Sequence, residues 1–410
     1  MDRTRTGVRR SNDEGDSGVS TSVIVAGART PIGKLSGALA SLTAAELGGR
    51  AIAAALERSG LGTDGVDAVV MGTVVQAGVG PNPARQAAVA AGLPMTVPAT
   101  TVNNLCLSGL EAIMQADRLI ATGAADVVVA GGMESMTNAP YLVRGARTGL
   151  KYGTTGFEDA LDRDALVCAF DGVSMGESTE SYQASENISR AEQDEFAARS
   201  HRLAAAATES GAFAAEIAPV EIASRKGAVT VADDEGIRAG TTVDSLGKLR
   251  PAFAKDGTIT AGASSQLSDG AAAVIVMRKD VAEARGIEWI AEIKAHALVA
   301  GPDTSLLHQP ANAIEAALKR DGETTVADLD LLEINEAFAG VAIASMRQLG
   351  VEADKVNIHG GAIAVGHPVG MSGARIVLSL AHSLKARGGG KGAAALCGGG
   401  GQGIAMIIEV

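Results

Sequence analysis

Segments typical of buried strands alternate with segments typical of helices along most of this chain of 410 residues. In the first third, strands and helices are expected in turn at 21–27, 43–60, 66–71, 83–92, 99–103, 107–123 and 125–131. The strand-like segments are continuously apolar, as in sheets that helices cover on both faces. This alternation predicts a layered α/β fold.

The second half of the chain echoes the first. The strand 329–334 matches 66–71, the strand 355–359 matches 99–103, and residues 371–374 open a helix as residues 107–110 do. The other elements expected after the interruption are a strand at 272–277, which completes the first half, and strands at 289–299, 393–397 and 404–409 and a helix at 310–320 in the second half. The echo predicts an internal duplication in which each half contributes one sheet.

A polar, loop-rich segment interrupts the alternation between residues 133 and 260. Within it, Ser189 and Glu192 form a capping box that predicts a helix to about Ser210, and an earlier helix is expected over 175–186. We expect four parts, namely a disordered N-terminal tail (1–20), a first half (21–132 plus 261–287), an inserted loop domain (133–260) and a second half (288–410).

Charge and cysteine usage exclude several classes of function. The net charge is −12, so a nucleic acid would be repelled without a basic patch, and none is visible. No apolar run reaches the length of a membrane span, and the first twenty residues lack the apolar core of a signal peptide. The cysteines Cys106, Cys168 and Cys397 are too few and too scattered for a disulfide framework or a zinc site. We therefore expect no nucleic-acid partner, no membrane contact, no metal and a cytoplasmic location.

Cys106 stands where an apolar strand runs into a helix. Unpaired backbone N–H groups and the positive end of the helix dipole are expected there, and both favour the thiolate over the thiol. Ser108 and Gly109 are small and permit close packing of the first helical turn. Free cysteines are also commonly inert core residues, so the position alone leaves both a nucleophile and a core residue open.

Two polar residues of the second half stand at positions suited to a site. His367 lies between Gly366 and Pro368 in a glycine-rich loop, which suits a base or an oxyanion donor. An isolated loop histidine more often has only a structural role. Asn335 closes a strand, where layered α/β proteins build their sites, and a helix-capping role is the alternative.

Cys397 is followed by four glycines, residues 398–401. Their N–H groups can form an anion-binding nest beside a titratable sulfur. The alternative is a flexible turn between two strands, but such a turn needs only one or two glycines. No GxGxxG motif follows the first strand and no GxxxxGK motif occurs, so nucleotide-dependent chemistry has little support.

Together these motifs resemble those of the thiolase family. The resemblance rests on residues 102–109, 131–136, 335–338, 360–375 and 397–403 and covers residues 20–410. Thiolases have two βαβαβαββ halves in a five-layered α/β/α/β/α core, with a loop domain inserted after the first half. The resemblance therefore implies this fold, in agreement with the duplication and the insertion.

The resemblance also implies catalytic roles. Cys106 would accept the acyl group, His367 would activate it, and Cys397 would move the α-proton of acetyl-CoA. Asn335, through a held water, would serve the enolate oxygen together with His367. The backbone N–H groups of Cys106 and Gly399 would serve the tetrahedral intermediate.

Contacts to coenzyme A are implied in the inserted segment and after the strand that ends at Asn335. The residues concerned are Leu166, Met175, Arg238, Phe253, Ala261, Ser265, Ala337 and Phe338. Two departures from the family pattern concern substrate recognition. Ser174 stands where several short-chain members have histidine, and Ala-Ser-Ser-Gln at 263–266 replaces the more usual Asn-Ala-Ser-Gly.

The activity implied is that of an acetyl-CoA C-acetyltransferase, which joins two acetyl-CoA molecules reversibly into acetoacetyl-CoA by ping-pong transfer. Acyl-CoA thioesters would be its substrates and no bound cofactor or metal would be needed. A homodimer or homotetramer is expected. The bulky Leu107 and Met371 favour short acyl chains. A degradative 3-ketoacyl-CoA thiolase of broader chain length is the main alternative. A ketoacyl synthase, which uses two separated histidines, and a silent acyl-CoA-binding relative are less well supported.

Overall fold

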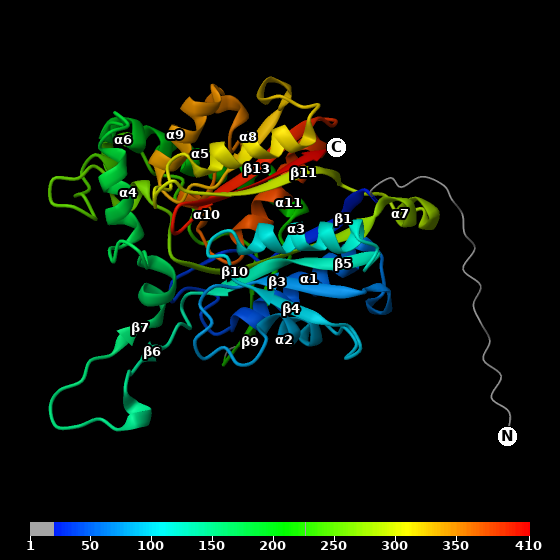
Figure 1. Cartoon of the computed structure of the whole chain (residues 1–410), viewed down its shortest axis with the longest axis horizontal. Coiled ribbons are helices and arrows are strands. Elements are labelled where there is room, and N and C mark those ends of the chain that lie inside the picture. Colours follow the sequence, from blue (N-terminus) through cyan, green and yellow to red (C-terminus); the bar gives the residue numbers. More distant parts are fainter. Residues whose placement is uncertain (1–19, 226) are drawn as a thin grey trace.

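The computed structural model describes residues 20–225 and 227–410. Residues 1–19 of the expected tail therefore lie outside the described residues. Figure 1 shows a layered body of helices and strands in which the early and late parts of the chain form two stacked halves.

The strands of the first half lie side by side in the order β4-β3-β5-β10-β1. Their bounds are Ala99–Val102 (β4), Ala68–Gly72 (β3), Val127–Ser135 (β5), Ser268–Arg278 (β10) and Ser22–Arg29 (β1). β3 is parallel to β4 and β5, whereas β10 is antiparallel to β5 and β1. The short β2 (Gly33–Lys34) also pairs with β10.

The strands of the second half repeat this arrangement in the order β12-β13-β14-β11. They are Leu331–Ile334 (β12), Lys391–Gly398 (β13), Gln402–Glu409 (β14) and Ala291–Ala300 (β11). β12 is parallel to β13, and β14 is antiparallel to β13 and β11, as in the first half. The predicted duplication is confirmed.

We expected each half to contribute its own sheet, but one pair of strands joins the two sheets into one. Val23 and Ile24 of β1 pair with Glu292 and Ala291 of β11, which makes the two sets of strands continuous. The contact forms because β1 and β11 are the outer strands of their sets and meet there in antiparallel orientation.

The predicted strand at 355–359 is also wrong. Only Val356 forms an isolated parallel bridge, to Leu332. At the next residue, Asn357, the backbone turns into the left-handed region with φ of 47°. The Asn357 side chain accepts a hydrogen bond from Ile334 N and donates one to Ile334 O, both at 2.8 Å. A side-chain amide thus replaces the ladder that a further strand would have made.

Helices form three layers around these strands. α1 (Ala44–Ser59) and α2 (Pro83–Ala90) cover the outer face of the first half, and α8 (Gln309–Asp321) and α9 (Ala339–Leu349) cover that of the second. α3 (Ser108–Ala121) and α11 (Ser372–Ala386) pack against each other between the two sets of strands. The predicted five-layered α/β/α/β/α fold is confirmed.

The two central helices approach each other closely at glycines. A Cβ on Gly109 would lie 2.8 Å from the nitrogen of Ala374, and one on Gly373 would lie 2.4 Å from the nitrogen of Leu110. Any larger residue would separate the helices. The loops carrying Cys106 and His367 lead into these helices, and a Cβ on Gly109 would lie 2.8 Å from Gly370 O, so this contact brings the two loops together.

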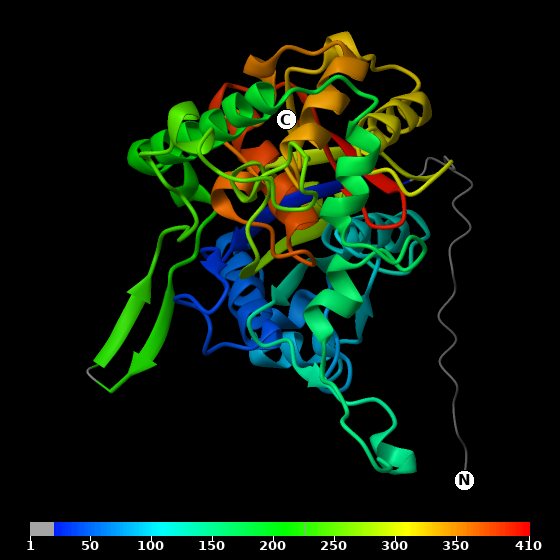
Figure 2. The same ribbon diagram turned by 90° about the vertical axis from the view of Figure 1, so that its left-hand side faces the viewer.

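The inserted segment holds its own short elements. They are β6 (Tyr141–Leu142), β7 (Glu158–Asp159), α4 (Met175–Gln183), α5 (Arg190–Ser210), β8 (Val220–Ser224), β9 (Gly227–Val231) and α6 (Val243–Leu246). The predicted capping box at Ser189 and Glu192 is confirmed. α4 ends at Gln183, three residues before the predicted end. Figure 2 shows the β6–β7 arm and the β8–β9 hairpin extending away from the body.

Two more α-helices complete the described chain, α7 (Lys279–Arg285) and α10 (Ala362–Val365). Single turns of 3₁₀ or π helix occur at Thr63–Gly65, Ala146–Thr148, Asp162–Leu166, Ala212–Ala215, Ala261–Ala263, Val326–Asp328 and Ala353–Lys355. Within residues 20–225 and 227–410, the helices all fall short of the length and apolar character needed to cross a bilayer.

Candidate active site

The loop between β4 and α3 holds Cys106 in a fixed conformation. Leu105, the preceding residue, has a positive φ of 50°, which is uncommon for a residue with a branched side chain. The hydroxyl of Ser108 accepts a hydrogen bond from Asn104 N at 2.8 Å and donates one to Leu105 O at 2.6 Å. Asn103 accepts from Leu105 N at 3.1 Å. These bonds determine where the Cys106 sulfur lies.

Two backbone N–H groups converge on the Cys106 sulfur, its own and that of Gly399. These are the two N–H groups that the resemblance assigns to the tetrahedral intermediate. The first half of the chain and the glycine-rich turn of the second half therefore meet at this sulfur.

The expectation that Cys106 favours its thiolate is wrong. Burial raises the pKa of Cys106 to about 12, and the nearby Glu134 charge raises it further, although the two N–H groups oppose both effects. α3 begins at Ser108, two residues after Cys106, and the positive end of its dipole does not lower the pKa of Cys106 enough to offset the effect of burial. The resting residue is a thiol, and it needs a base before it can attack.

His367 is held in one tautomer by its hydrogen bonds. Its Nδ1 lies 2.6 Å from the hydroxyl of Ser372, and this hydroxyl donates to the carbonyl oxygen of Pro368 at 3.0 Å. Ser372 must therefore accept from an Nδ1–H group, an assignment that follows from the hydrogen-bond network. Burial and the nearby Arg375 lower the pKa of His367 to about 3, so the ring is neutral and Nε2 is free to accept a proton.

Asn335, directly after β12, contacts this unprotonated nitrogen. Its Nδ2 lies 3.5 Å from His367 Nε2. Its Oδ1 is buried and has no hydrogen-bond partner among the described residues. A buried acceptor without a partner is costly, which fits an atom that receives a donor from a water or a substrate.

Cys397 is buried near the end of β13, close enough to Cys106 for the two sulfurs to interact. Burial raises the pKa of Cys397, and the neighbouring Cys106 raises it further. Cys397 is therefore also a thiol at rest. The structure brings together the two cysteines that lie 291 positions apart in the sequence (397 minus 106).

The four glycines after Cys397 form a packed turn. A Cβ on Gly398 would lie 2.7 Å from Leu107 Cγ, and one on Gly399 would lie 2.5 Å from Met175 Cε. A Cβ on Gly401 would lie 1.8 Å from the carbonyl oxygen of Asp303. The alternative of a merely flexible turn is wrong, because close contacts require glycine at these positions.

Glu134, at the end of β5, is a site residue that the sequence analysis did not assign. Its buried carboxylate accepts hydrogen bonds from Val74 N at 2.9 Å and Val75 N at 3.2 Å, in the loop after β3. It also accepts one from Gly370 N at 3.0 Å, in the loop that carries His367. The carboxylate therefore connects the two halves beside the site.

Burial raises the pKa of Glu134 to about 7, although these hydrogen bonds oppose the shift. The sequence signal that could have identified it is an acidic residue three positions after the predicted end of a continuously apolar strand at residue 131. Ser372 was missed as well, although it lies five positions after His367, the spacing at which a loop can turn back onto a helix start.

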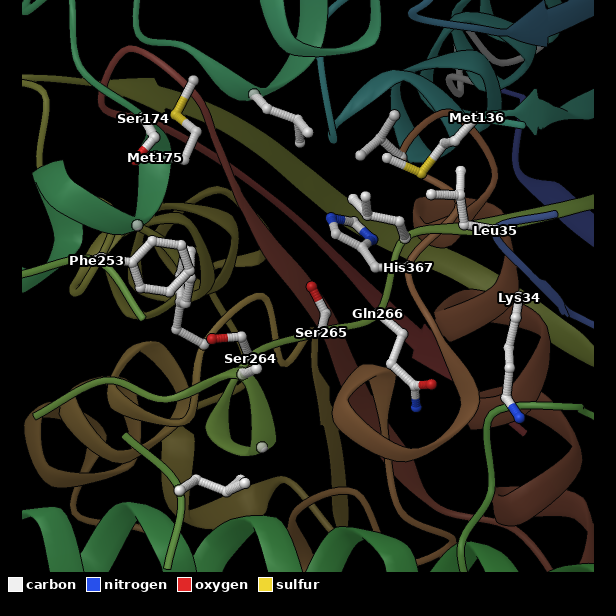
Figure 3. A pocket seen from close by; sticks show the side chains of 18 of the residues that line it. Lys34, Leu35, Met136, Ser174, Met175, Phe253, Ser264, Ser265, Gln266 and His367 are labelled. Atoms are coloured by element: carbon white, nitrogen blue, oxygen red, sulfur yellow. The ribbon is translucent and has the colours of Figure 1, made fainter. Parts of the chain in front are cut away.

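A cavity of about 690 Å³ leads to His367. Figure 3 shows its lining, with Phe253 and Met175 on one side and His367 at the centre. The predicted residues that line it are Leu166, Met175, Arg238, Phe253, Ala261, Ser265, Phe338 and His367. Ala337 is not in the lining, and its carbonyl oxygen accepts from Ser265 N at 3.0 Å. Cys106, Cys397, Asn335 and Gly399 are also outside the lining.

The cavity carries polar groups that the sequence analysis did not select as binding residues. Lys34, Asp162, His201 and Gln266 line it, and Ser174 is also in the wall. The hydroxyl of Ser174 caps α4, since it donates to the Glu177 carboxylate at 2.7 Å and accepts from Glu177 N at 3.2 Å. Within the described residues, no cluster of three or more potential ligands is arranged to hold a metal ion.

Comparison with known families accounts for nearly the whole described chain. Residues 22–280 match the family described as "Thiolase, N-terminal domain", and residues 287–410 match "Thiolase, C-terminal domain". A protein of Mycolicibacterium smegmatis described as "Probable acetyl-CoA acetyltransferase" is 56% identical over 388 residues, which cover 94% of this chain and 100% of that protein. The acetyl-CoA acetyltransferase of Escherichia coli is 47% identical, covering 94% and 98%.

Solved structures give the same result. The acetyl-CoA acetyltransferase of Bacillus anthracis superimposes with a TM-score of 0.93 at 40% identity, covering 96% of this chain and 100% of that one. Human mitochondrial 3-ketoacyl-CoA thiolase superimposes with a TM-score of 0.92 at 39% identity, covering 95% and 99%. Fold similarity is therefore nearly equal for two relatives whose names give different substrates.

Proposed function

The chain belongs to the thiolase family, and on this premise we propose that it is an acetyl-CoA C-acetyltransferase that joins two acetyl-CoA molecules reversibly into acetoacetyl-CoA and CoA. The observation that carries the proposal is the meeting of two thiols, the partly exposed Cys106 and the buried Cys397, beside the two N–H groups on Cys106. A binding protein has no use for this arrangement. The names of the full-length relatives from M. smegmatis and E. coli support the same activity.

In the first half-reaction, Cys106 attacks the acetyl thioester while His367 Nε2 takes the thiol proton. The negative oxygen of the tetrahedral intermediate lies in the N–H groups of Cys106 and Gly399. When the intermediate collapses, the C–S bond to CoA breaks and Cys397 gives its proton to the departing CoA thiolate. The products are CoA, acetyl-Cys106, a protonated His367 and a Cys397 thiolate, so the protons balance.

In the second half-reaction, the Cys397 thiolate takes an α-proton from a second acetyl-CoA. The enolate oxygen receives hydrogen bonds from protonated His367 and from a water on Asn335. The enolate carbon then attacks acetyl-Cys106 to form the new C–C bond. Cys106 leaves as a thiolate and recovers its proton from His367, which returns each group to its resting state.

The resting pKa values suit this sequence of proton transfers. Because the pKa values of Cys106 and Cys397 are raised and that of His367 is lowered, all three groups begin neutral. Charge separates only after acetyl transfer to Cys106, and it persists in the acetyl-enzyme until the second half-reaction returns the protons. A buried site strengthens the attraction between protonated His367 and the Cys397 thiolate.

The competing activity is a degradative 3-ketoacyl-CoA thiolase, and the small Ser174 in the cavity wall favours it. Against it, Met175 in the cavity wall lies next to Gly399, and Leu107 lies next to Gly398, so large apolar side chains stand beside the glycine turn. Thiolysis of 3-ketoacyl-CoA substrates with four, six and ten carbons distinguishes the two. We expect kcat/KM to be highest with acetoacetyl-CoA and to fall with length. Equal or rising values would favour the degradative activity.

We further propose a homodimer or homotetramer and a cytoplasmic location. All three cysteines are unpaired, which suits a reducing compartment. The division into a first half (21–132 plus 261–287), an inserted loop domain (133–260) and a second half (288–410) is also retained as a proposal. It is supported by the matching strand orders of the two halves.

A further inference from the structure

We propose that the side-chain amide of Gln266 is a positioning group that holds Arg238 at the cavity, and that it thereby sets the affinity for the nucleotide part of coenzyme A. This inference rests on the proposed function. The resemblance to thiolases gives glycine as the more usual residue at this position, where this chain has Gln266.

The side-chain nitrogen of Gln266 donates hydrogen bonds to three backbone carbonyl groups. Nε2 lies 3.1 Å from Gly236 O, 3.0 Å from Ile363 O and 3.1 Å from Ala364 O, and it donates to these carbonyl groups. The last two belong to α10, a short helix whose final carbonyls have few partners within the helix. The amide therefore joins α10 of the second half to the loop at Gly236 in the inserted segment.

The amide nitrogen is tightly packed on the side of Gly236. A Cβ on Gly236 would lie 2.9 Å from Gln266 Nε2 and 2.6 Å from Ala364 O. The loop at Gly236 thus packs directly against α10 and against the amide that bridges them. Figure 3 shows the Gln266 side chain turned away from His367, with its amide at the far end.

The oxygen side of the amide faces Arg238. Arg238 Nη2 lies 3.4 Å from Gln266 Oε1, a long hydrogen bond in which the guanidinium donates. The backbone N–H of Arg238 donates to Nδ1 of the buried His201 at 3.2 Å. Burial and the Arg238 charge lower the pKa of His201 to about 4, which keeps that nitrogen an acceptor. Arg238 is therefore held at its backbone by His201 and at its side chain by Gln266.

Neutral partners leave the charge of Arg238 available. Among the ion pairs of the described residues, none includes Arg238. A guanidinium that lines a cavity without a carboxylate partner is well suited to a phosphate oxygen. A glutamate at position 266 would neutralise it and would also repel the three carbonyl oxygens.

Gln266 also contacts His367, but through its backbone and not through its side chain. His367 N donates to the backbone carbonyl oxygen of Gln266 at 3.1 Å. Any residue at position 266 supplies this carbonyl, so a side-chain substitution leaves the contact possible. The side chain is therefore predicted to affect coenzyme binding and not the chemistry at Cys106.

The test compares acetylation of Cys106 by two donors, acetyl-CoA and the acetyl thioester of N-acetylcysteamine, which lacks the nucleotide. For Gln266→Ala, we expect the half-saturating concentration of acetyl-CoA to rise about tenfold, the usual loss for a hydrogen bond to a charged group. The half-saturating concentration of the truncated donor should stay unchanged, and so should the maximal rate with either donor. Arg238→Ala should raise the half-saturating concentration of acetyl-CoA in the same way. In the double variant, Gln266→Ala should raise it hardly any further than Arg238→Ala alone.

Equal losses with both donors, or fully additive effects of the two substitutions, would overturn the inference. If Gln266→Ala does not fold, Gln266→Met keeps the length of the side chain without its amide and should weaken only acetyl-CoA. The proposed function fails separately, because it fails if the wild-type enzyme is acetylated by neither donor.

Discussion

The Nδ1 atom of His367 lies 2.6 Å from the hydroxyl of Ser372, which in turn donates to the Pro368 carbonyl oxygen. This pair fixes the histidine tautomer and leaves Nε2 unprotonated, the atom that takes the thiol proton of Cys106 in the proposed mechanism. Ser372 is thus a positioning residue that acts through His367. Its position at the first turn of α11 ties the base to the helix that packs on α3.

Replacing Ser372 with alanine should slow acetylation of Cys106 by about 10- to 100-fold, because the ring then loses the acceptor that orients it. Rapid-quench measurement of acetylation gives the rate. Ser379→Ala is the matched control, since Ser379 is a buried serine on the same helix that donates to Glu216 at 2.7 Å, away from His367. Equal effects of the two substitutions would mean that Ser372 acts only through stability.

Replacing Cys397 with alanine should separate the two half-reactions. Cys106 and His367 remain, so acetyl-Cys106 should still form, although more slowly, because the leaving CoA thiolate has lost a proton donor. Condensation should fall by about 10²- to 10⁴-fold or more, the usual contribution of a general acid or base. Acetylation is followed by mass spectrometry and condensation by the appearance of acetoacetyl-CoA.

Cys168→Ala is the control for this substitution. Like Cys397, Cys168 is buried and forms no disulfide bond, but it belongs to none of the hydrophobic clusters that contain Cys106 or Cys397. It should leave both half-reactions near their wild-type rates. Near-normal condensation in the Cys397 variant would remove Cys397 from the mechanism.

Glu134 predicts a specific dependence of stability on pH. Its pKa is raised from 4.5 to about 7 in the folded chain, so the folded state binds the extra proton between these values. The contribution of Glu134 to stability is therefore fully present below pH 4.5 and is lost as pH rises through 7. A shift of this size corresponds to about 3 kcal/mol.

The measurement is the free energy of unfolding of wild type minus that of Glu134→Gln, taken from pH 4.5 to 7.5. This difference should fall by about 3 kcal/mol as pH rises, since all other titrating groups cancel. A difference that stays constant would show that Glu134 remains ionised throughout. A difference that rises would show that its hydrogen bonds outweigh burial.

Local patterns made much of the fold predictable. The capping box at Ser189 and the glycines at positions 109 and 373 depend on residues close in sequence or on small size alone, and the structure agrees with them. The echo between the halves correctly indicated the duplicated strand order. The candidate site residues Cys106, Cys397, His367 and Asn335 were selected because each stands in a short motif, and the resemblance to thiolases rests on these motifs.

The errors arose where distant residues decide the outcome. Asn357 replaces a strand ladder through bonds to Ile334, which the local sequence at 355–359 does not reveal. The thiolate expected at Cys106 is disfavoured by burial, a property of the assembled layers. Glu134 bonds to Gly370, which lies 236 positions away. A contact between residues this far apart, such as Glu134 with Gly370, cannot be predicted from the local sequence around either residue.

The central claim is that Cys106 carries the acetyl group between two molecules of acetyl-CoA. Wild-type protein incubated with acetyl-CoA alone and then digested should show one added acetyl group, on the peptide that contains Cys106. The label should disappear on addition of CoA, because the transfer is reversible, and should not form in Cys106→Ala. Stable label on Cys397 or Cys168, or no acetylated peptide at all, would contradict the account.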